Sequence, residues 1–223
     1  MIRRNYQREL DEILRNIEDG QAVPRLLLHS CCAPCSSYVL EYLSEYFHIT
    51  DFFYNPNISP GKEYRHRVEE MKRLIQELPM RHPVDFVEGP YEPARYYDEV
   101  KGLEEEPEGG ARCEVCFRMR LEEAAKIAAE GGFDYFTTTL TISPMKDPVL
   151  LNTIGEEMGE RYGVKYLDSE FRKKNGYKRS IELSREYDLY RQDFCGCIFS
   201  KQEAERRREK EKEKEKEKEK EKQ

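Results

Sequence analysis

The sequence lacks any long apolar segment, and it contains no tryptophan. No run of apolar residues approaches the roughly 18 to 20 residues that a membrane-spanning helix needs. The opening residues, Met1 to Asn5, are not followed by the apolar core of a secretory signal. We therefore expect a cytoplasmic protein without a membrane partner.

The chain also lacks a positive net charge, because 45 acidic residues outnumber 38 basic ones and the formal net charge is −7. Every residue from Glu205 to Lys222 is charged, with 8 Glu and 10 Lys or Arg, which leaves residues 1–204 with 37 acids and 28 bases. In strict Glu-Lys alternation, side chains four residues apart repel each other, while those three apart attract. The two effects on the stability of a helix are therefore of similar size and opposite sign. We expect one domain over residues 1–203 and a disordered charged tail over residues 204–223.

Short apolar segments alternate with segments of helical spacing along the chain. Because parallel strands need crossover connections, this alternation predicts an α/β fold with a mainly parallel sheet flanked by helices. We also expect a helical C-terminal region before the charged tail. The predicted strands span 25–29, 49–54, 84–88, 135–141 and 165–167, and the predicted helices span 2–19, 62–78, 91–100, 116–130 and 148–161, with one more starting at Pro34. Ligands bind beyond the carboxyl ends of the strands in such sheets.

The seven cysteines fall into three tight groups, and the first group directly follows the first predicted strand. An odd number, so grouped and without an export signal, argues against a disulfide framework and favours metal or redox chemistry. We expect the three groups to meet in space. They are Cys31, Cys32 and Cys35; Cys113 and Cys116; and Cys195 and Cys197.

Each group is open to more than one interpretation. Cys113 and Cys116 have the spacing of a chelating pair for zinc or for a cluster, although a redox dithiol also uses it. The adjacent Cys31 and Cys32 favour an iron-sulfur cluster over one tetrahedral zinc, although buried cysteine is often only a small apolar side chain. The segment Cys195-Gly-Cys197 is compatible with a strained, reducible disulfide, with two metal ligands, or with a turn that holds two incidental cysteines.

Polar residues beside these cysteines are candidates for moving a proton or binding a metal. His29 precedes the first group, and Tyr190 and Asp193 precede the last one. Each could supply a proton or a ligand. A hydrogen-bonding role alone is the more common one for such residues.

A basic segment over residues 171–191 is a weaker indication, and it concerns a nucleic-acid partner. It holds seven bases against three acids, together with Tyr177, Tyr187 and Tyr190. Such a segment can contact a phosphate backbone and stack bases, although a charge run is usually just a solvated surface. The candidate RNA contacts are Arg172, Lys173, Lys174, Lys178 and Arg179.

Three motifs together resemble one known family. The segment from His29 reads His-Ser-Cys-Cys-Ala-Pro-Cys-Ser, and the segment from Cys113 reads Cys-Glu-Val-Cys-Phe-Arg-Met-Arg-Leu. The segment ending at Cys197 reads Tyr-Asp-Leu-Tyr-Arg-Gln-Asp-Phe-Cys-Gly-Cys. In this order, over about residues 24–200, they resemble the QueH-type epoxyqueuosine reductases. The charged tail lies outside the resemblance.

The resemblance implies an oxidoreductase that reduces epoxyqueuosine to queuosine in the anticodon of transfer RNA, the last step of queuosine biosynthesis, without cobalamin. It also implies a Rossmann-like fold related to the adenine-nucleotide α hydrolases. Those relatives hold phosphates with a Ser-Gly-Gly loop after the first strand. This chain has Cys-Cys-Ala-Pro-Cys there, which argues against the use of ATP.

The resemblance further implies roles for the cysteines. A 4Fe-4S cluster would be bound by Cys31, Cys32, Cys113 and Cys116. The remaining thiols would form a redox-active pair, Cys195 with Cys197, or they would help to hold a second, mononuclear iron. Candidate ligands of that iron are Cys35, Cys195 or Cys197, and Asp193. Electrons would come from a donor such as a ferredoxin or a flavodoxin.

Two other functions remain open from the sequence. One is a zinc-stapled RNA-binding module with Cys113, Cys116, Cys195 and Cys197 as ligands, which leaves the first cysteine group unexplained. The other is a transfer RNA thiolation enzyme on the same fold, against which the missing phosphate loop weighs.

Overall fold

The computed structural model describes residues 4–20 and 22–221. Its five strands form one parallel sheet in the order β3-β2-β1-β4-β5, which confirms the predicted α/β class. The strands are β1 (Arg25–His29), β2 (His48–Phe53), β3 (Val84–Glu88), β4 (Tyr135–Thr138) and β5 (Lys165–Tyr166). The helices are α1 (Tyr6–Glu18), α2 (Ala33–Leu43), α3 (Gly61–Glu77), α4 (Pro93–Glu99), α5 (Ala111–Glu130), α6 (Pro148–Tyr162), α7 (Gly176–Glu186) and α8 (Ile198–Glu221), with a short 3-10 helix η1 (Thr139–Ile142).

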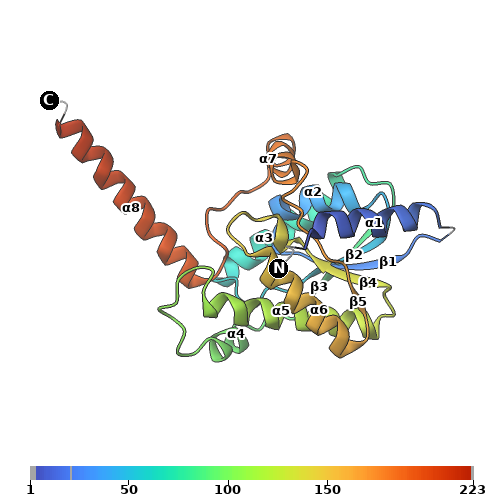
Figure 1. The fold of residues 1–223 in the computed structure, drawn as a ribbon. Helices are drawn as coiled ribbons and strands as arrows, with labels where there is room; N and C mark the ends of the chain where they lie inside the picture. The colour runs from blue at the N-terminus through green and yellow to red at the C-terminus, as the bar shows by residue number, and fades with distance from the viewer. Residues whose placement is uncertain (1–3, 21, 222–223) are drawn as a thin grey trace.

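Helices cover both faces of the sheet, so the body has three layers (Figure 1). Helices α1, α2, α3 and α7 lie on one side, and α4, α5 and α6 lie on the other. Successive side chains of a strand point to opposite faces. In β1, Leu26 and Leu28 therefore join the core under α1 and α2, while Leu27 joins the core under α5 and α6.

Local signals fix several helix ends. Asn5 caps α1 by accepting a hydrogen bond from the Arg8 amide, and Asp147 caps α6 by accepting one from Val149. Gly163 ends α6 in the left-handed conformation, with a φ of 74°, where a glycine has no steric penalty.

Two predicted elements differ from the structure, and one helix had no predicted bounds. Helix α5 starts at Ala111 rather than at residue 116, so Cys113 lies in its first turn and not on the preceding loop. Strand β4 ends at Thr138, because the Thr138 hydroxyl accepts a hydrogen bond from the Leu140 amide and starts η1. Helix α7 lies in the basic segment, where the predicted helical C-terminal region had no bounds for an individual helix.

The charged tail is helical in the structure, whereas we predicted disorder from residue 204. Helix α8 continues to Glu221 and projects away from the body (Figure 1). Its first turns are anchored, since Ser200 and Ala204 are both buried. Glu, Lys and Arg are all good helix formers, so an anchored start continues without interruption through a segment free of Gly and Pro. The division at residue 203 stays a prediction.

No helix within residues 4–20 and 22–221 is both long enough and apolar enough to cross a membrane.

Candidate metal centre

The cysteine site lies at the topological switch point of the sheet. The chain leaves β1 toward β2 on one side, and it returns to β4 on the other side of β1. A crevice forms beyond the carboxyl ends of two such strands. Cys31 and Cys32 follow β1 into this crevice, and Thr139 follows β4. The Thr139 hydroxyl donates to Cys31 Sγ across the crevice at 3.8 Å.

The first cysteine group forms a compact triad. The Sγ atoms of Cys31, Cys32 and Cys35 all lie within 4.8 Å of one another, and those of Cys31 and Cys32 are 3.8 Å apart. In the described part of the chain, this is the one group of three such residues that is close enough to hold a metal ion. If two thiolates each lay about 2.3 Å from one tetrahedral metal, their Sγ atoms would be about as far apart as those of Cys31 and Cys32. The triad therefore fits a metal-sulfur centre.

The second group projects from the first turns of α5. Cys116 is buried and Cys113 is partly buried. Burial raises the pKa of Cys113 to about 11 and that of Cys116 to about 12. Buried thiols with such pKa values stay protonated at neutral pH unless a positive partner or a metal takes the place of the proton.

The third group closes the site from the C-terminal side. Gly196 has a φ of 126°, a conformation open to glycine, and a Cβ there would lie 2.9 Å from Ile58 Cγ1. Cys197 immediately precedes α8, and its Sγ accepts a hydrogen bond from the Ser200 amide at 3.3 Å. The thiol thus takes the role of an N-cap side chain. All seven cysteines are free thiols in the structure.

The structure brings the three groups together, as the sequence predicted. One buried cluster contains Cys31, Cys32, Cys116 and Cys197, with Cys35 and Cys113 packed against it. Cys195 faces the same cavity as the first triad. The pKa of Cys116 is raised further by the charges of Cys195 and Cys197.

Three helices begin at this site. Cys32 is the N-cap residue of α2, Cys113 lies in the first turn of α5, and Cys197 precedes α8. Each helix start carries a partial positive charge and unpaired amide groups. Three of them directed at one group of thiols favour thiolates and an anionic metal-sulfur centre.

Three fully buried arginines surround the cysteines, and none of them is among the candidate site residues that the sequence predicts. They are Arg67, Arg112 and Arg120, each 1% exposed. Arg67 Nε pairs with Glu63 Oε1 at 2.8 Å, and its Nη1 donates to the Cys195 carbonyl at 3.0 Å. Its Nη2 has no partner in the described chain, and a buried donor without an acceptor is unfavourable. Arg67 therefore indicates a further acceptor at this site. Single arginines within amphipathic helices carry no signal of burial in the sequence.

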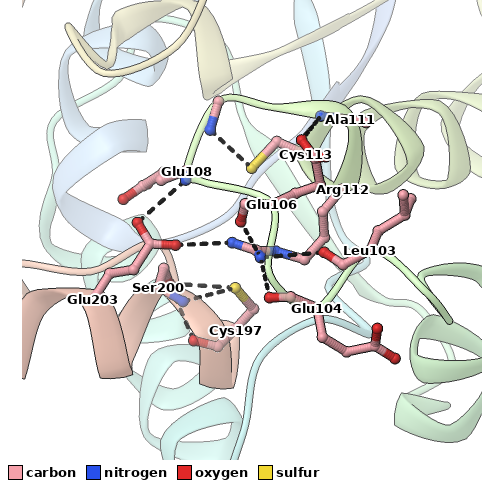
Figure 2. Close-up of polar contacts among 11 residues, drawn as sticks. Leu103, Glu104, Glu106, Glu108, Ala111, Arg112, Cys113, Cys197, Ser200 and Glu203 are labelled. Atoms are coloured by element: carbon pink, nitrogen blue, oxygen red, sulfur yellow. Dashed lines mark hydrogen bonds and ion pairs between the residues drawn. The ribbon is translucent and has the colours of Figure 1, made fainter.

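Arg112 ties the loop before α5 to the start of α8 (Figure 2). Its Nη1 donates to the carbonyl groups of Leu103, Glu104 and Glu106. Its Nη2 pairs with Glu203 Oε1 at 3.1 Å, and Glu203 Oε2 accepts from the Glu108 amide at 3.2 Å. Figure 2 shows Cys113 and Cys197 flanking this network, so it positions two of the three cysteine groups.

Arg120 has no carboxylate partner within the described residues. Its Nη2 donates to Asn55 Oδ1 at 2.6 Å, its Nε lies 3.3 Å from His29 Nε2, and its Nη1 lies 4.0 Å from Cys116 Sγ. A fully buried guanidinium needs a negative charge nearby. The neighbouring sulfur atoms are the groups that can supply it.

His29 is buried beneath the cysteines. Its Nδ1 is 2.8 Å from Thr138 Oγ1, and its Nε2 is 3.1 Å from the Tyr54 carbonyl. Burial and the charge of Arg120 lower the pKa of His29 to about 3. The described residues that line the cavity do not include it. This placement fits a positioning role, with both ring nitrogens already engaged, rather than the proton donor that we considered.

A cavity of about 240 Å³ opens above the triad. Asp193 lines it, with Oδ2 3.5 Å from Arg208 Nε. Tyr190 is not among the described lining residues, and its hydroxyl donates to Glu63 Oε2 at 3.3 Å. The structure thus brings Asp193, but not Tyr190, to the cavity next to Cys35 and Cys195.

The five candidate RNA contacts are all engaged in ion pairs. Arg179 makes a bidentate pair with Glu41, with distances of 2.6 and 3.0 Å. In the other four ion pairs, Arg172 and Lys173 contact Glu170, Lys174 contacts Asp11, and Lys178 contacts Glu182. The basic segment is therefore largely neutralised by acids from the body, and RNA contact there stays a prediction.

Comparison with known proteins identifies the family of the chain. The family model described as "Epoxyqueuosine reductase QueH" matches residues 26–203. The epoxyqueuosine reductase QueH of Streptococcus pyogenes is 46% identical over 198 residues, covering 88% of this chain and 78% of its own. That of Staphylococcus epidermidis is 44% identical over 200 residues, covering 88% and 84%. That of Thermotoga maritima is 38% identical over 182 residues, covering 80% and 91%.

A solved structure shares the fold. It is the U34-tRNA thiolase NcsA from Methanococcus maripaludis with its [4Fe-4S] cluster, with a TM-score of 0.51 and 14% sequence identity. The match covers 87% of this chain and 67% of the thiolase chain. At this identity the likeness concerns the arrangement of strands and helices alone.

Proposed function

Because the chain belongs to the epoxyqueuosine reductase QueH family, we propose that it reduces epoxyqueuosine to queuosine in transfer RNA with a 4Fe-4S cluster bound by its cysteines. The observation that carries the proposal is the meeting of all three cysteine groups at the switch point of the sheet. Arg120, which is buried without a carboxylate partner among the described residues, and the three helix starts support an anionic centre there.

The cluster ligands that we propose are Cys31, Cys32, Cys113 and Cys116. Support comes from the burial of Cys31, Cys32 and Cys116, from the partial burial of Cys113, and from the charge of Arg120 beside Cys116. A 4Fe-4S cluster supplies electrons one at a time, and an adjacent iron with an open position would act as a Lewis acid. The thiols left over are Cys35, Cys195 and Cys197, which together with Asp193 are the candidates for holding such an iron.

The reaction itself sets what the remaining residues must do. Converting an epoxide into an alkene removes the oxygen as water and consumes two electrons and two protons. If Cys195 and Cys197 close to a disulfide, their two S–H bonds supply both electrons and both protons, so the step balances. Gly196 between them provides the flexibility that a small-ring disulfide needs. A donor such as a ferredoxin or flavodoxin would then reduce the pair again.

Asp193 is the proton carrier that we propose at the cavity. Its carboxyl group lines the wall beside Cys195 and is half exposed. A carboxyl group in that place can pass a proton to the leaving oxygen when the substrate fills the cavity. Asp193→Asn removes the proton and keeps the shape of the side chain. We expect turnover to fall at least tenfold while iron content stays unchanged, unless Asp193 is an iron ligand, in which case iron falls with it.

The proposed function is tested with anaerobically reconstituted protein. Its iron, zinc and acid-labile sulfide content is measured first, and it is then incubated with a chemical reductant and transfer RNA that carries epoxyqueuosine. Digestion and mass spectrometry of the nucleosides should show queuosine in place of the epoxide. Replacing Cys195 by Ser should abolish the product and keep the four irons and four sulfides of the cluster.

Two results would contradict the proposal. Unchanged epoxyqueuosine with a fully loaded cluster would remove the activity. Zinc alone, without colour or sulfide after reconstitution, would remove the cluster and favour a zinc-stapled RNA-binding module.

A further inference from the structure

We propose that Lys146, Arg191 and Arg207, which line the cavity above the cysteines, bind the phosphates that flank the nucleotide whose base enters the cavity. This inference rests on the proposed function, since it assumes an RNA strand as the ligand. It moves the main RNA contact from the five candidate residues of the basic segment to Arg191, at the end of that segment, and to two cations outside it, so that three separate parts of the chain contribute. These parts are the loop before α6, the segment after α7, and helix α8.

The three cations are free of carboxylate partners. In the described part of the chain, none of them has a carboxylate oxygen within the 4.0 Å of an ion pair. Arg191 Nη1 donates to the Ser184 hydroxyl at 3.1 Å, and Arg207 Nη2 donates to the Asp193 carbonyl at 3.4 Å. Both groups are neutral, so the positive charges remain available to an anion from solution.

This freedom contrasts with the neighbouring basic segment. There, the five candidate RNA contacts all face acids, and the pair of Arg179 with Glu41 is bidentate. Binding a phosphate at those positions would first require breaking ion pairs. The chain is acidic as a whole, with a net charge of −7, so an unpaired group of cations around one cavity is a local exception. Such an exception favours a local anionic ligand over non-specific binding.

The size of the cavity explains why the cations would contact the backbone. At about 240 Å³ it is smaller than the roughly 300 to 1,000 Å³ that is common for complete small-molecule sites. The cavity can take one modified base together with the ring of its substituent, whereas the sugar-phosphate backbone must stay outside. Enzymes that act on a base commonly take it out of the stack in this way. The flanking phosphates then lie at the cavity mouth.

Acidic residues also line the cavity, next to the cations. Asp193 Oδ2 is 3.5 Å from Arg208 Nε, and Glu108 adds a second carboxyl group. Carboxylates repel phosphates, so the acids are suited to the base and its polar substituents. Burial lowers the pKa of Lys146, but the charges of Cys195, Cys31, Cys35 and Glu108 outweigh this effect and raise the pKa, so the ammonium group stays charged. The wall therefore offers polar partners for the nucleoside as well as cations for its backbone.

The test measures RNA binding by single charge-removing variants. Lys146→Gln, Arg191→Gln and Arg207→Gln are prepared as iron-loaded full-length protein, and fluorescence anisotropy follows a labelled anticodon stem-loop RNA over a range of salt concentrations. Each variant should weaken binding about fivefold to tenfold near physiological salt. The slope of log K against log salt should decrease by about one for each lost phosphate contact.

Lys126→Gln is the matched control, because it removes one exposed lysine charge on α5 that does not line the cavity. It should bind RNA like the unmodified protein. Iron content measured on every variant confirms that the cysteine site is intact. Wild-type affinity in the three cavity variants would overturn the inference, and so would an equal loss in Lys126→Gln. RNA binding that depends on the three cations without any queuosine product would refute the proposed reaction and leave this inference standing.

Discussion

A single buried arginine gives the sharpest residue-scale evidence for an anionic centre. Arg120 is 1% exposed and has no carboxylate partner in the described chain, yet it lies 4.0 Å from Cys116 Sγ. Without a metal centre, such a charge is a net cost to folding. With thiolates and a cluster beside it, the same charge is compensated.

Arg120→Met should therefore have opposite effects on the empty and loaded protein. The free energy of unfolding of the metal-free form should stay the same or rise, because an uncompensated buried charge is replaced by an apolar side chain. Iron retention in the presence of a chelator should fall severalfold, whereas Arg120→Lys should keep most of it. Chemical denaturation and iron assays check both effects. Equal iron retention by the unmodified protein and both variants would contradict the role of Arg120 beside an anionic centre.

A second residue-scale prediction concerns pH and lies far from the cysteines. Burial, aided by the charge of Glu156, raises the pKa of Asp168 from 3.8 to about 7. The opposing effect of Arg4, whose Nη2 lies 3.4 Å from Asp168 Oδ2, is smaller. The folded state then binds the proton more tightly than the unfolded state, so this contribution to stability is present below pH 4 and is lost as pH rises through 7.

Asp168→Asn should remove that loss. At pH 8 the variant should be more stable than the unmodified protein by on the order of 1 kcal/mol, a modest figure because water partly screens the carboxyl group. At pH 4 the two proteins should be equally stable within error. Urea unfolding at both pH values measures the difference. A stability change of the same size at pH 4 and pH 8 would show that Asp168 does not titrate between them.

At the scale of elements, helix α8 is divided into an anchored start and a projecting end. Glu203 in its second turn pairs with Arg112 and accepts from the Glu108 amide, while the following charged residues leave the body. Glu203→Ala should lower the free energy of unfolding by about 2 kcal/mol, because Arg112 stays buried without its carboxylate. Glu205→Ala, two residues further along, should change it by less than about 0.5 kcal/mol. Thermal unfolding distinguishes them, and equal effects would refute the anchoring role.

The elements also show what the sequence could and could not predict. The five strands and their parallel arrangement followed from the alternation of short apolar segments with helical ones. The start of α5 was missed because Gly110 and Ala111 follow a Gly-rich loop, and nothing local distinguishes that loop from the first helical turn. The tail was missed for another reason: its helix depends on an anchor, Ala204 and Glu203, that exists only in the folded body.

The same limit applies to the site. The cysteine groups were recognisable because their spacing carries chemistry, and the rule that ligands bind beyond the carboxyl ends of the strands placed the first group at the site. The buried arginines were not recognisable, since Arg67, Arg112 and Arg120 lie in helices rich in other charged residues. Burial of a charge is decided by what packs on it from distant segments, which single-sequence patterns do not record.

At the scale of the whole molecule, the cysteine site joins three segments that are otherwise far apart in the chain. The switch point of the sheet supplies residues 31–35, the start of α5 supplies residues 113–116, and the segment before α8 supplies residues 195–197. Binding a metal centre that the unfolded chain cannot assemble stabilises the fold. The gain should be concentrated in the segments that the centre ties to the sheet.

Hydrogen exchange of loaded and metal-free protein should reveal this distribution. Removal of iron should increase exchange over residues 103–116 and 189–204, because the network around Arg112 and Cys197 loses its connection to the crevice. Strands β1 and β2 should exchange equally in both forms, because their protection comes from the sheet ladder and the buried core. Cys113→Ser, which we propose loses one cluster ligand, should reproduce the metal-free pattern. Exchange that increases evenly through the sheet, or not at all, would show that the centre does not hold these segments together.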